Sequence, residues 1–263
     1  MAFFKEVANS SYRWRYAISG LGLLWALSTA LYTISKLAYI LIEDIPSVIG
    51  NFTIIRSFLV QVRMGQVLLL QFITAILIVI FSQLVRSKRG FRFLLLLVVV
   101  GILPSALTGH SGNTDWHELA VGSWAVHIFA VSIWVALVLA LLYLAVFQVD
   151  SIPANIQVAS RISLFCFIGV IISGVVNAAV RMPSVASVFN STYGTILIVK
   201  TLLFLLIGLI AMYYRIRVIP HNLATSSIFF RLLILEVILM GMAMMVGVVL
   251  SETKFPIVRV FPN

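Results

Sequence analysis

Three of the four histidines in this sequence of 263 residues lie within one short stretch, LTGHSGNTDWHELAVGSWAVH, which occupies residues 107–127. They are His110, His117 and His127, and the stretch contains no lysine or arginine. Imidazole nitrogens bind transition-metal ions, and on membrane helices they can also be axial ligands of a haem iron. The stretch is therefore a candidate metal-binding segment.

A second candidate group stands in the run ILEVILMGMAMMVG, near the C-terminal end of the sequence. Glu236, Met240 and Met244 follow one another at intervals of four residues, which places them on one stripe of a helix. Thioether sulfur and imidazole are the ligands that suit Cu(I). Methionine is also a common packing residue in apolar helices, and both roles stay open for this group.

The composition shows what kind of chain must position these side chains. Hydrophobic residues make up 62% of it and charged residues only 10%, which excludes an ordinary soluble domain and indicates an integral membrane protein. The net charge of +10 does not indicate a nucleic-acid partner, because the basic residues stand in short segments between apolar runs. A single cysteine, Cys166, excludes an internal disulfide and a thiolate metal cage.

Seven apolar segments are long enough to cross a bilayer as helices, each needing about 20 residues. We therefore predict an all-α, polytopic bundle of transmembrane helices, forming one integral membrane domain over residues 1–263. The connection over residues 37–63 is partly apolar and predicts an interfacial or re-entrant element. The seven predicted spans are residues 16–36, 64–84, 91–108, 117–146, 157–180, 193–213 and 229–250.

The distribution of lysine and arginine predicts the orientation, because basic loops face the cytoplasm. The N-terminus and the connections around residues 86–92 and 215–231 are basic, whereas the loop GHSGNTDWHE has no basic residue. The N-terminus is therefore predicted inside and the C-terminus outside. His127 would lie about 15 Å deeper than His117, at a depth comparable to that of Met240.

Three ionisable residues within the apolar runs need an explanation. A histidine in mid-span, such as His127, is costly unless it has a partner, so it either has a function or bridges helices. Lys200 and Glu236 would either neutralise one another across the bundle or mark an ion pathway.

The order of these motifs resembles the copper resistance protein D family of bacterial integral membrane proteins, over about residues 64–256. Two departures are a WVALVLAL run where the family commonly has small residues, and the apparent lack of an additional N-terminal span. The matching motifs are T-G-H at 108–110, the histidine at 117, H-x6-W at 127–134, S-G at 173–174 followed by Asn177, T-Y-G-x5-K at 192–200, Arg231 with Glu236, and the closing LSETKFP.

The resemblance implies a role in moving or handling copper at the bacterial cytoplasmic membrane, in copper import, copper resistance or copper supply to cytochrome oxidase. It implies that His110, His117 and His127 contact copper, with Met240 and Met244 added by ligand chemistry. The polar residues of the other motifs would have structural or gating roles. These are Asn177, Tyr193, Lys200 and Glu236.

We therefore expect a multi-pass copper transporter that is not an enzyme. No nucleotide-binding or phosphorylation motif is present, so transport would depend on a gradient or on a partner. One alternative is a haem-binding electron-transfer protein, which needs two histidines at similar depth on different helices. Another is a non-transporting assembly partner that docks an extracytoplasmic copper chaperone or a cytochrome oxidase assembly factor.

Overall fold

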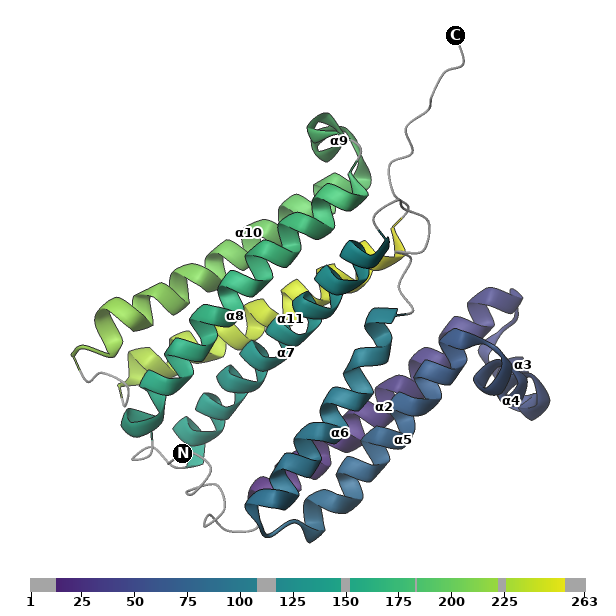
Figure 1. Ribbon diagram of the computed structural model, residues 1–263, viewed down its shortest axis with the longest axis horizontal. Coiled ribbons are helices and arrows are strands. Elements are labelled where there is room, and N and C mark those ends of the chain that lie inside the picture. Colours follow the sequence, from purple (N-terminus) through teal and green to yellow (C-terminus); the bar gives the residue numbers. More distant parts are fainter. Residues whose placement is uncertain (1–12, 108–116, 148–151, 183, 222–225, 254–263) are drawn as a thin grey trace. The chain divides into compact units, whose positions relative to one another are not determined.

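The computed structural model describes residues 13–107, 117–147, 152–182, 184–221 and 226–253 (Figure 1). Within these residues every regular element is a helix and none is a strand. The chain divides into two compact units, Met1–Asn113 and Thr114–Asn263. The predicted all-α helix bundle is confirmed, and the prediction of one integral membrane domain over both units stays a prediction.

The described residues of the first unit form three long helices and two short ones. The long helices are α2 (Arg13–Leu41), α5 (Arg63–Leu84) and α6 (Lys88–Leu107), and α5 packs against both of the others. Gly101 of α6 approaches side chains of the other two long helices so closely that a Cβ there would collide with Trp25 and Thr74. A glycine at this position lets the three helices pack tightly.

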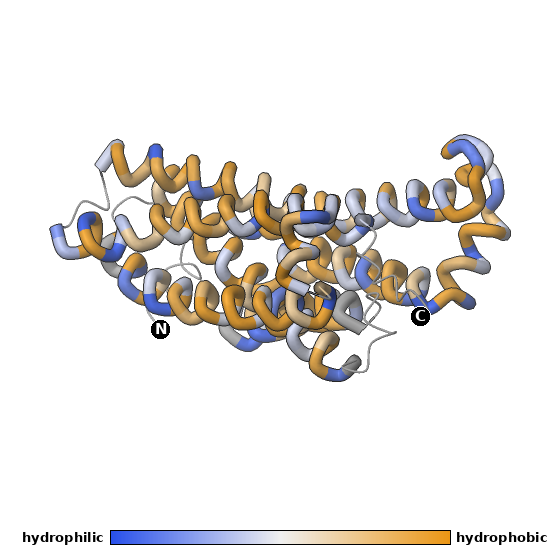
Figure 2. The backbone as a smooth tube through the Cα atoms, turned by 90° about the horizontal axis from the view of Figure 1, so that it is seen from above, coloured by the Kyte–Doolittle hydropathy of each residue, from blue (hydrophilic) through white to orange (hydrophobic). Residues whose placement is uncertain are grey.

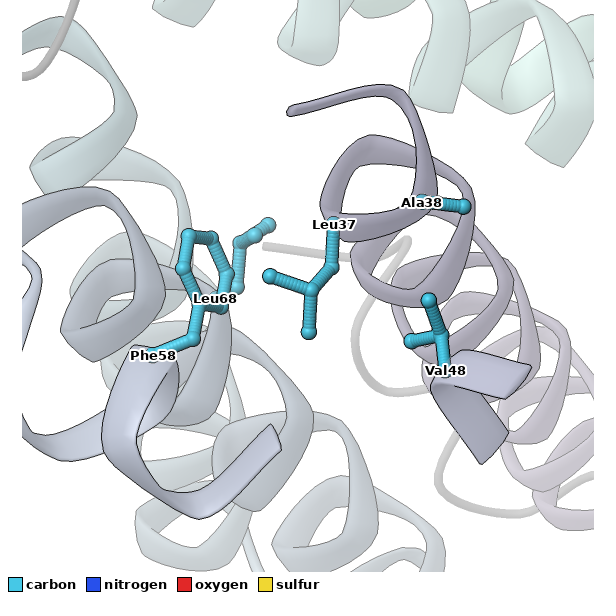
Figure 3. Close-up of a cluster of buried hydrophobic side chains, with 5 residues drawn as sticks. All are labelled: Leu37, Ala38, Val48, Phe58 and Leu68. Atoms are coloured by element: carbon cyan, nitrogen blue, oxygen red, sulfur yellow. The ribbon is translucent and has the colours of Figure 1, made fainter. Parts of the chain in front are cut away.

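The short helices α3 (Ile45–Gly50) and α4 (Phe52–Gln61) fill the connection between α2 and α5. Side chains from all four helices form one buried apolar cluster (Figure 3). The segment over residues 37–63 is therefore helical and packed against the long helices, while its predicted place at the membrane interface stays a prediction. The cluster consists of Leu37, Ala38, Val48, Phe58 and Leu68.

The described residues of the second unit form four long helices, which carry most of the candidate site residues. They are α7 (His117–Phe147), α8 (Ile152–Arg181), α10 (Thr192–Tyr213) and α11 (Ser227–Glu252). Helix α7 packs against α8 and α11, and α10 packs against α11. The short helix α9 (Val185–Asn190) precedes α10, and a π-helical turn, η3 (Tyr214–Val218), follows it.

Capping residues and one glycine determine where α10 and α11 begin. Ser191 and Ser226 each accept a hydrogen bond from a backbone amide in the first turn of the following helix, at 3.0 and 3.2 Å. Gly194, in the first turn of α10, lies directly against the backbone of Val188 in α9, where a Cβ would collide. The α9–α10 corner therefore requires a residue without a side chain at this position.

Six of the described helical segments are long and apolar enough to span a membrane, which makes the chain a multi-pass membrane protein by length and composition. Figure 2 shows that hydrophobic residues predominate along the helices. Helix α6 coincides with the third predicted span but is not one of the six, so the count of seven stays a prediction, as does the orientation. The six segments are Trp14–Leu41, Arg63–Leu84, Glu118–Phe147, Asn155–Arg181, Thr192–Val218 and Ser227–Glu252.

Candidate functional site

His127 of α7 is joined to α8 by a hydrogen bond between its Nδ1 and the Oγ of Ser173, at 3.0 Å. The hydroxyl of Ser173 has one proton, and it donates that proton to the carbonyl oxygen of Gly169 at 2.6 Å. With the single Ser173 proton on Gly169 rather than on Val170, the other carbonyl in reach at 3.2 Å, Ser173 accepts the proton of Nδ1, and the neutral imidazole is then the Nδ1–H tautomer. In this tautomer the Nε2 atom of His127 carries a free lone pair, the form in which an imidazole binds a metal ion.

Neighbouring residues of α7 hold this arrangement in place. Ser123 donates a hydrogen bond to the backbone oxygen of Ser173 at 3.0 Å, a second link between the two helices. The ring of Trp124 is nearly parallel to the His127 ring, with centroids 5.8 Å apart and an angle of 6° between the planes. The guanidinium of Arg181, on α8, lies over the ring of Trp124, 5.3 Å from the ring centre. The imidazole is thus held by contacts from both α7 and α8.

Two basic side chains lie near the imidazole, and a buried amide lies one helical turn from Ser173 on α8. Lys200 of α10 and Arg181 of α8 both lie close enough to His127 to interact with it electrostatically. The Lys200 ammonium reaches α11, because a Cβ on Gly247 would lie 3.3 Å from its Nζ atom. Asn177 is 7% exposed, and neither its amide nitrogen nor its amide oxygen has a hydrogen-bond partner among the described residues. We refer to His127, Ser173, Asn177, Arg181 and Lys200 as the polar layer.

An aromatic cluster lies next to the polar layer on the same helices. Trp134 meets Phe167 and Phe204 edge to face, with ring centroids 5.6 and 5.9 Å apart. Phe167 and Phe204 stack on one another at 4.7 Å with an angle of 7°. Since Trp134 is seven residues beyond His127, the cluster lies about 10 Å from it along α7. Three helices are joined here by apolar packing alone.

Glu236 of α11 lies on the other side of this cluster. It is 2% exposed, and the side chains of Trp134 and Tyr214 lie beside its carboxyl group. Tyr214 begins the π-helical turn η3, and its buried hydroxyl makes no hydrogen bond of ordinary geometry to a described residue. π-Helical turns in α-helices occur frequently at functional sites.

Mutual neutralisation is one of the two predicted relationships between Lys200 and Glu236. The structure does not pair these two residues. Lys200 lies against Gly247, which is 11 residues from Glu236 and therefore about 16 Å away along α11. The two groups occupy different levels of the unit, separated by the aromatic cluster. Mutual neutralisation is thus not observed, and the predicted ion pathway remains as a hypothesis for both residues.

The two methionines of the predicted stripe differ in their surroundings. Met240 is 5% exposed, whereas Met244 is 53% exposed. Four residues turn a helix by about 400°, so Met244 is rotated by about 40° from the buried stripe. Trp134 of α7 lies beside Glu236 of α11, which aligns the two helices at this contact. His127 is seven residues from Trp134 and Met240 is four residues from Glu236, so Met240 lies about one helical turn from the level of His127. Met240 remains a candidate ligand inside the unit, but the structure does not place Met244 there.

The other predicted site residues are placed less fully. His117 begins α7, but its side chain and the whole of His110 lie outside the described residues. Tyr193 is buried in the first turn of α10, consistent with a structural role. Among the described residues no group of three His, Cys, Asp or Glu side chains could hold a metal ion.

Sequence reasoning did not assign a role to Ser123, Trp124, Tyr214 or Ser173, although the last of these appears in the S-G motif. A signal was present in the second half of α8, where Ser173, Asn177 and Arg181 recur every four residues in an otherwise apolar run that begins at Leu164. That spacing indicates a polar stripe facing other helices.

Two family models match the chain. Residues 157–250 match the model described as copper resistance protein D, and residues 2–118 match the one described as copper resistance protein D-like, N-terminal domain. No curated protein and no solved structure matches the chain significantly. The two matches follow the two structural units, and the likeness extends further toward the N-terminus than the predicted 64–256. His127 lies between them, outside both matches.

Proposed function

Because the chain belongs to the copper resistance protein D family, we propose that it moves copper ions across the bacterial cytoplasmic membrane through its second unit. Family membership and the apolar helices make it a copper-related, multi-pass membrane protein involved in copper resistance. Beyond this, we propose transport as the activity, the direction in which copper moves and the path that it follows. Copper is the cargo, it enters from the outer face, and the protein carries out no enzymatic conversion.

The observation that carries the proposal is the orientation of His127. A histidine within a membrane helix is costly unless it has a partner or a function. Here the partner, Ser173, bonds to Nδ1 and leaves the other ring nitrogen, Nε2, outside this bond. Metal-binding histidines are typically held in this way, with one nitrogen bound to a neighbour and the other free for the metal. His127 is therefore the proposed first copper contact within the bundle.

Met240 is the proposed second contact. It is buried on α11, which packs directly against α7, and it lies within about one turn of the level of His127. Imidazole and thioether together favour Cu(I) over harder ions. His110 and His117 are proposed to receive the ion at the outer face, before it descends to His127.

The charges of the polar layer support transit through this site rather than storage at it. Lys200 and Arg181 both interact electrostatically with His127, and like charges raise the energy of a cation bound there. A transport site must bind strongly enough to load and weakly enough to release. A site with two ligands and two nearby positive charges meets this requirement better than a closed cage of four ligands.

Two alternative functions would use the histidines differently. A haem protein would need a second imidazole facing His127, but among the described side chains the other histidine is His221, which is exposed in the turn that follows η3. An assembly partner for an extracytoplasmic copper chaperone or an oxidase assembly factor would need the outer histidines but not His127. Dependence of activity on His127 therefore separates transport from docking.

The proposal is tested by copper accumulation in bacteria that express the protein. Wild type is compared with His127→Ala and with His221→Ala, a control that removes an exposed histidine far from the polar layer. We expect His127→Ala to reduce accumulation to the level of cells without the protein and His221→Ala to leave it unchanged. Equal accumulation in all three, at equal amounts of protein in the membrane, would refute the proposal.

A further inference from the structure

We infer that the polar layer binds a small monovalent anion between Lys200 and Asn177. The inference rests on buried polar groups that lack partners, and it does not depend on whether the protein transports copper. A site for an anion would also explain why two basic side chains are gathered inside a membrane-spanning bundle beside His127.

The first observation concerns Lys200. Its side chain is half-buried on α10, within a helical segment that is apolar enough to span a membrane. No hydrogen bond or ion pair joins it to another residue in the described part of the chain. Its identified charged neighbour is Arg181, which has the same sign. A cation in such surroundings is stabilised by a nearby negative charge, and none of the described carboxylates supplies it.

The second observation concerns Asn177. The side chain is 7% exposed, and both of its polar atoms lack partners among the described residues. Burying an amide without hydrogen bonds is destabilising, so an unpaired one calls for a ligand. An amide –NH2 group can donate two hydrogen bonds to an anion. The amide nitrogen of Asn177 is thus a buried hydrogen-bond donor without an acceptor among the described residues.

The helix geometry brings these groups to one place. Asn177 stands one turn from Ser173, which is bonded to His127, and one turn from Arg181 on the same face of α8. Arg181 interacts electrostatically with both His127 and Lys200. Along α8, Asn177 therefore stands between Ser173, which is bonded to His127, and Arg181, which interacts with Lys200. Gly247 of α11 leaves room at this point, because any side chain there would meet the Lys200 Nζ atom at 3.3 Å.

The chemistry of the donors defines the ligand. One ammonium and one amide –NH2 group suit a small anion with a single charge. A halide and the carboxylate group of a small acid share this property. A bulky or doubly charged anion would carry more hydration than these few donors replace.

The experiment measures thermal unfolding of the purified full-length protein in detergent, without copper. Sodium chloride or sodium acetate replaces sodium gluconate at constant ionic strength, so that general screening of charges is unchanged. We expect the Tm of wild type to rise by about 2–4 °C, the shift produced by a ligand at about five times its Kd in a protein of this size. A rise with chloride alone identifies a halide site, and a rise with acetate as well identifies a site for carboxylates.

Three variants make the test specific. Lys200→Gln and Asn177→Ala should each abolish the rise, and Lys200→Arg should retain it, since the charge is kept. Lys36→Gln is the matched control, because Lys36 lies over the ring of Tyr39 in the first unit. The inference is wrong if wild type shows no rise with either anion, or if Lys200→Gln and Asn177→Ala show the same rise as wild type. Since no copper is present, failure here leaves the transport proposal untouched.

Discussion

Replacing Ser173 with alanine removes the hydroxyl that selects the tautomer of His127 while leaving the imidazole itself in place. The bond is 3.0 Å long, and Ser173 is 2% exposed, so little water can take over its role. A typical hydrogen bond contributes about 0.5–1.5 kcal/mol, and loss of a group that orients a metal ligand lowers metal affinity by about 10–100-fold. For a neutral hydroxyl we expect the lower end, about 10-fold or about 1.4 kcal/mol.

The assay is a competition titration of Cu(I) between the purified full-length protein and a chromophoric chelator under reducing conditions. Ser251→Ala is the matched control, because Ser251 is exposed on α11 and, within the described part of the chain, bonds to the carbonyl oxygen of Val248 alone, at 2.7 Å. Its affinity should equal that of wild type. If Ser173→Ala binds Cu(I) as tightly as Ser251→Ala does, the assignment of the His127 tautomer has no role in metal binding and the reasoning is refuted.

Two further predictions follow from burial and close packing. Met240→Leu should lower Cu(I) affinity, whereas Met244→Leu should not, because the first side chain is 5% exposed and the second 53%; equal loss in the same titration would contradict the assignment of Met240. Gly194→Ala should lower the stability of the protein in detergent by about 1–3 kcal/mol through collision with the backbone of α9, measured as a loss in Tm. Gly241→Ala, where a Cβ meets no atom within 4 Å, should leave Tm unchanged or slightly higher, and a similar loss in both glycine variants would show that the α9–α10 corner is not the cause.

The positions of the long helices follow directly from the sequence, because apolar runs of about 20 residues leave few alternatives in a membrane protein. The predicted run over residues 117–146, for example, appears as α7, His117–Phe147. The short helices α3, α4 and α9 were not predicted as such. They are shorter than a membrane span, and packing against neighbouring long helices stabilises them more than their own helical propensity does.

The candidate site was predictable only in part. The spacing of residues along one helix places side chains on a common stripe, but it does not show which helix faces that stripe. The bond between His127 and Ser173 joins positions 46 residues apart, so no local pattern could reveal it. The predicted stripe also failed within one helix. Met244 is rotated by about 40° from Met240, and this rotation is enough to take its side chain off the buried face. Lys200 and Glu236 have opposite charges, yet their depths differ too much for pairing.

The most direct test of the account is uptake of Cu(I) into vesicles that contain only the purified protein and lipid. Such vesicles lack chaperones and oxidase subunits, so uptake would require transport by the chain itself. We predict uptake well above that of protein-free vesicles, and its loss in His127→Ala but not in His221→Ala. Uptake no greater than that of protein-free vesicles, or uptake that His127→Ala does not reduce, would contradict a copper path through the second unit.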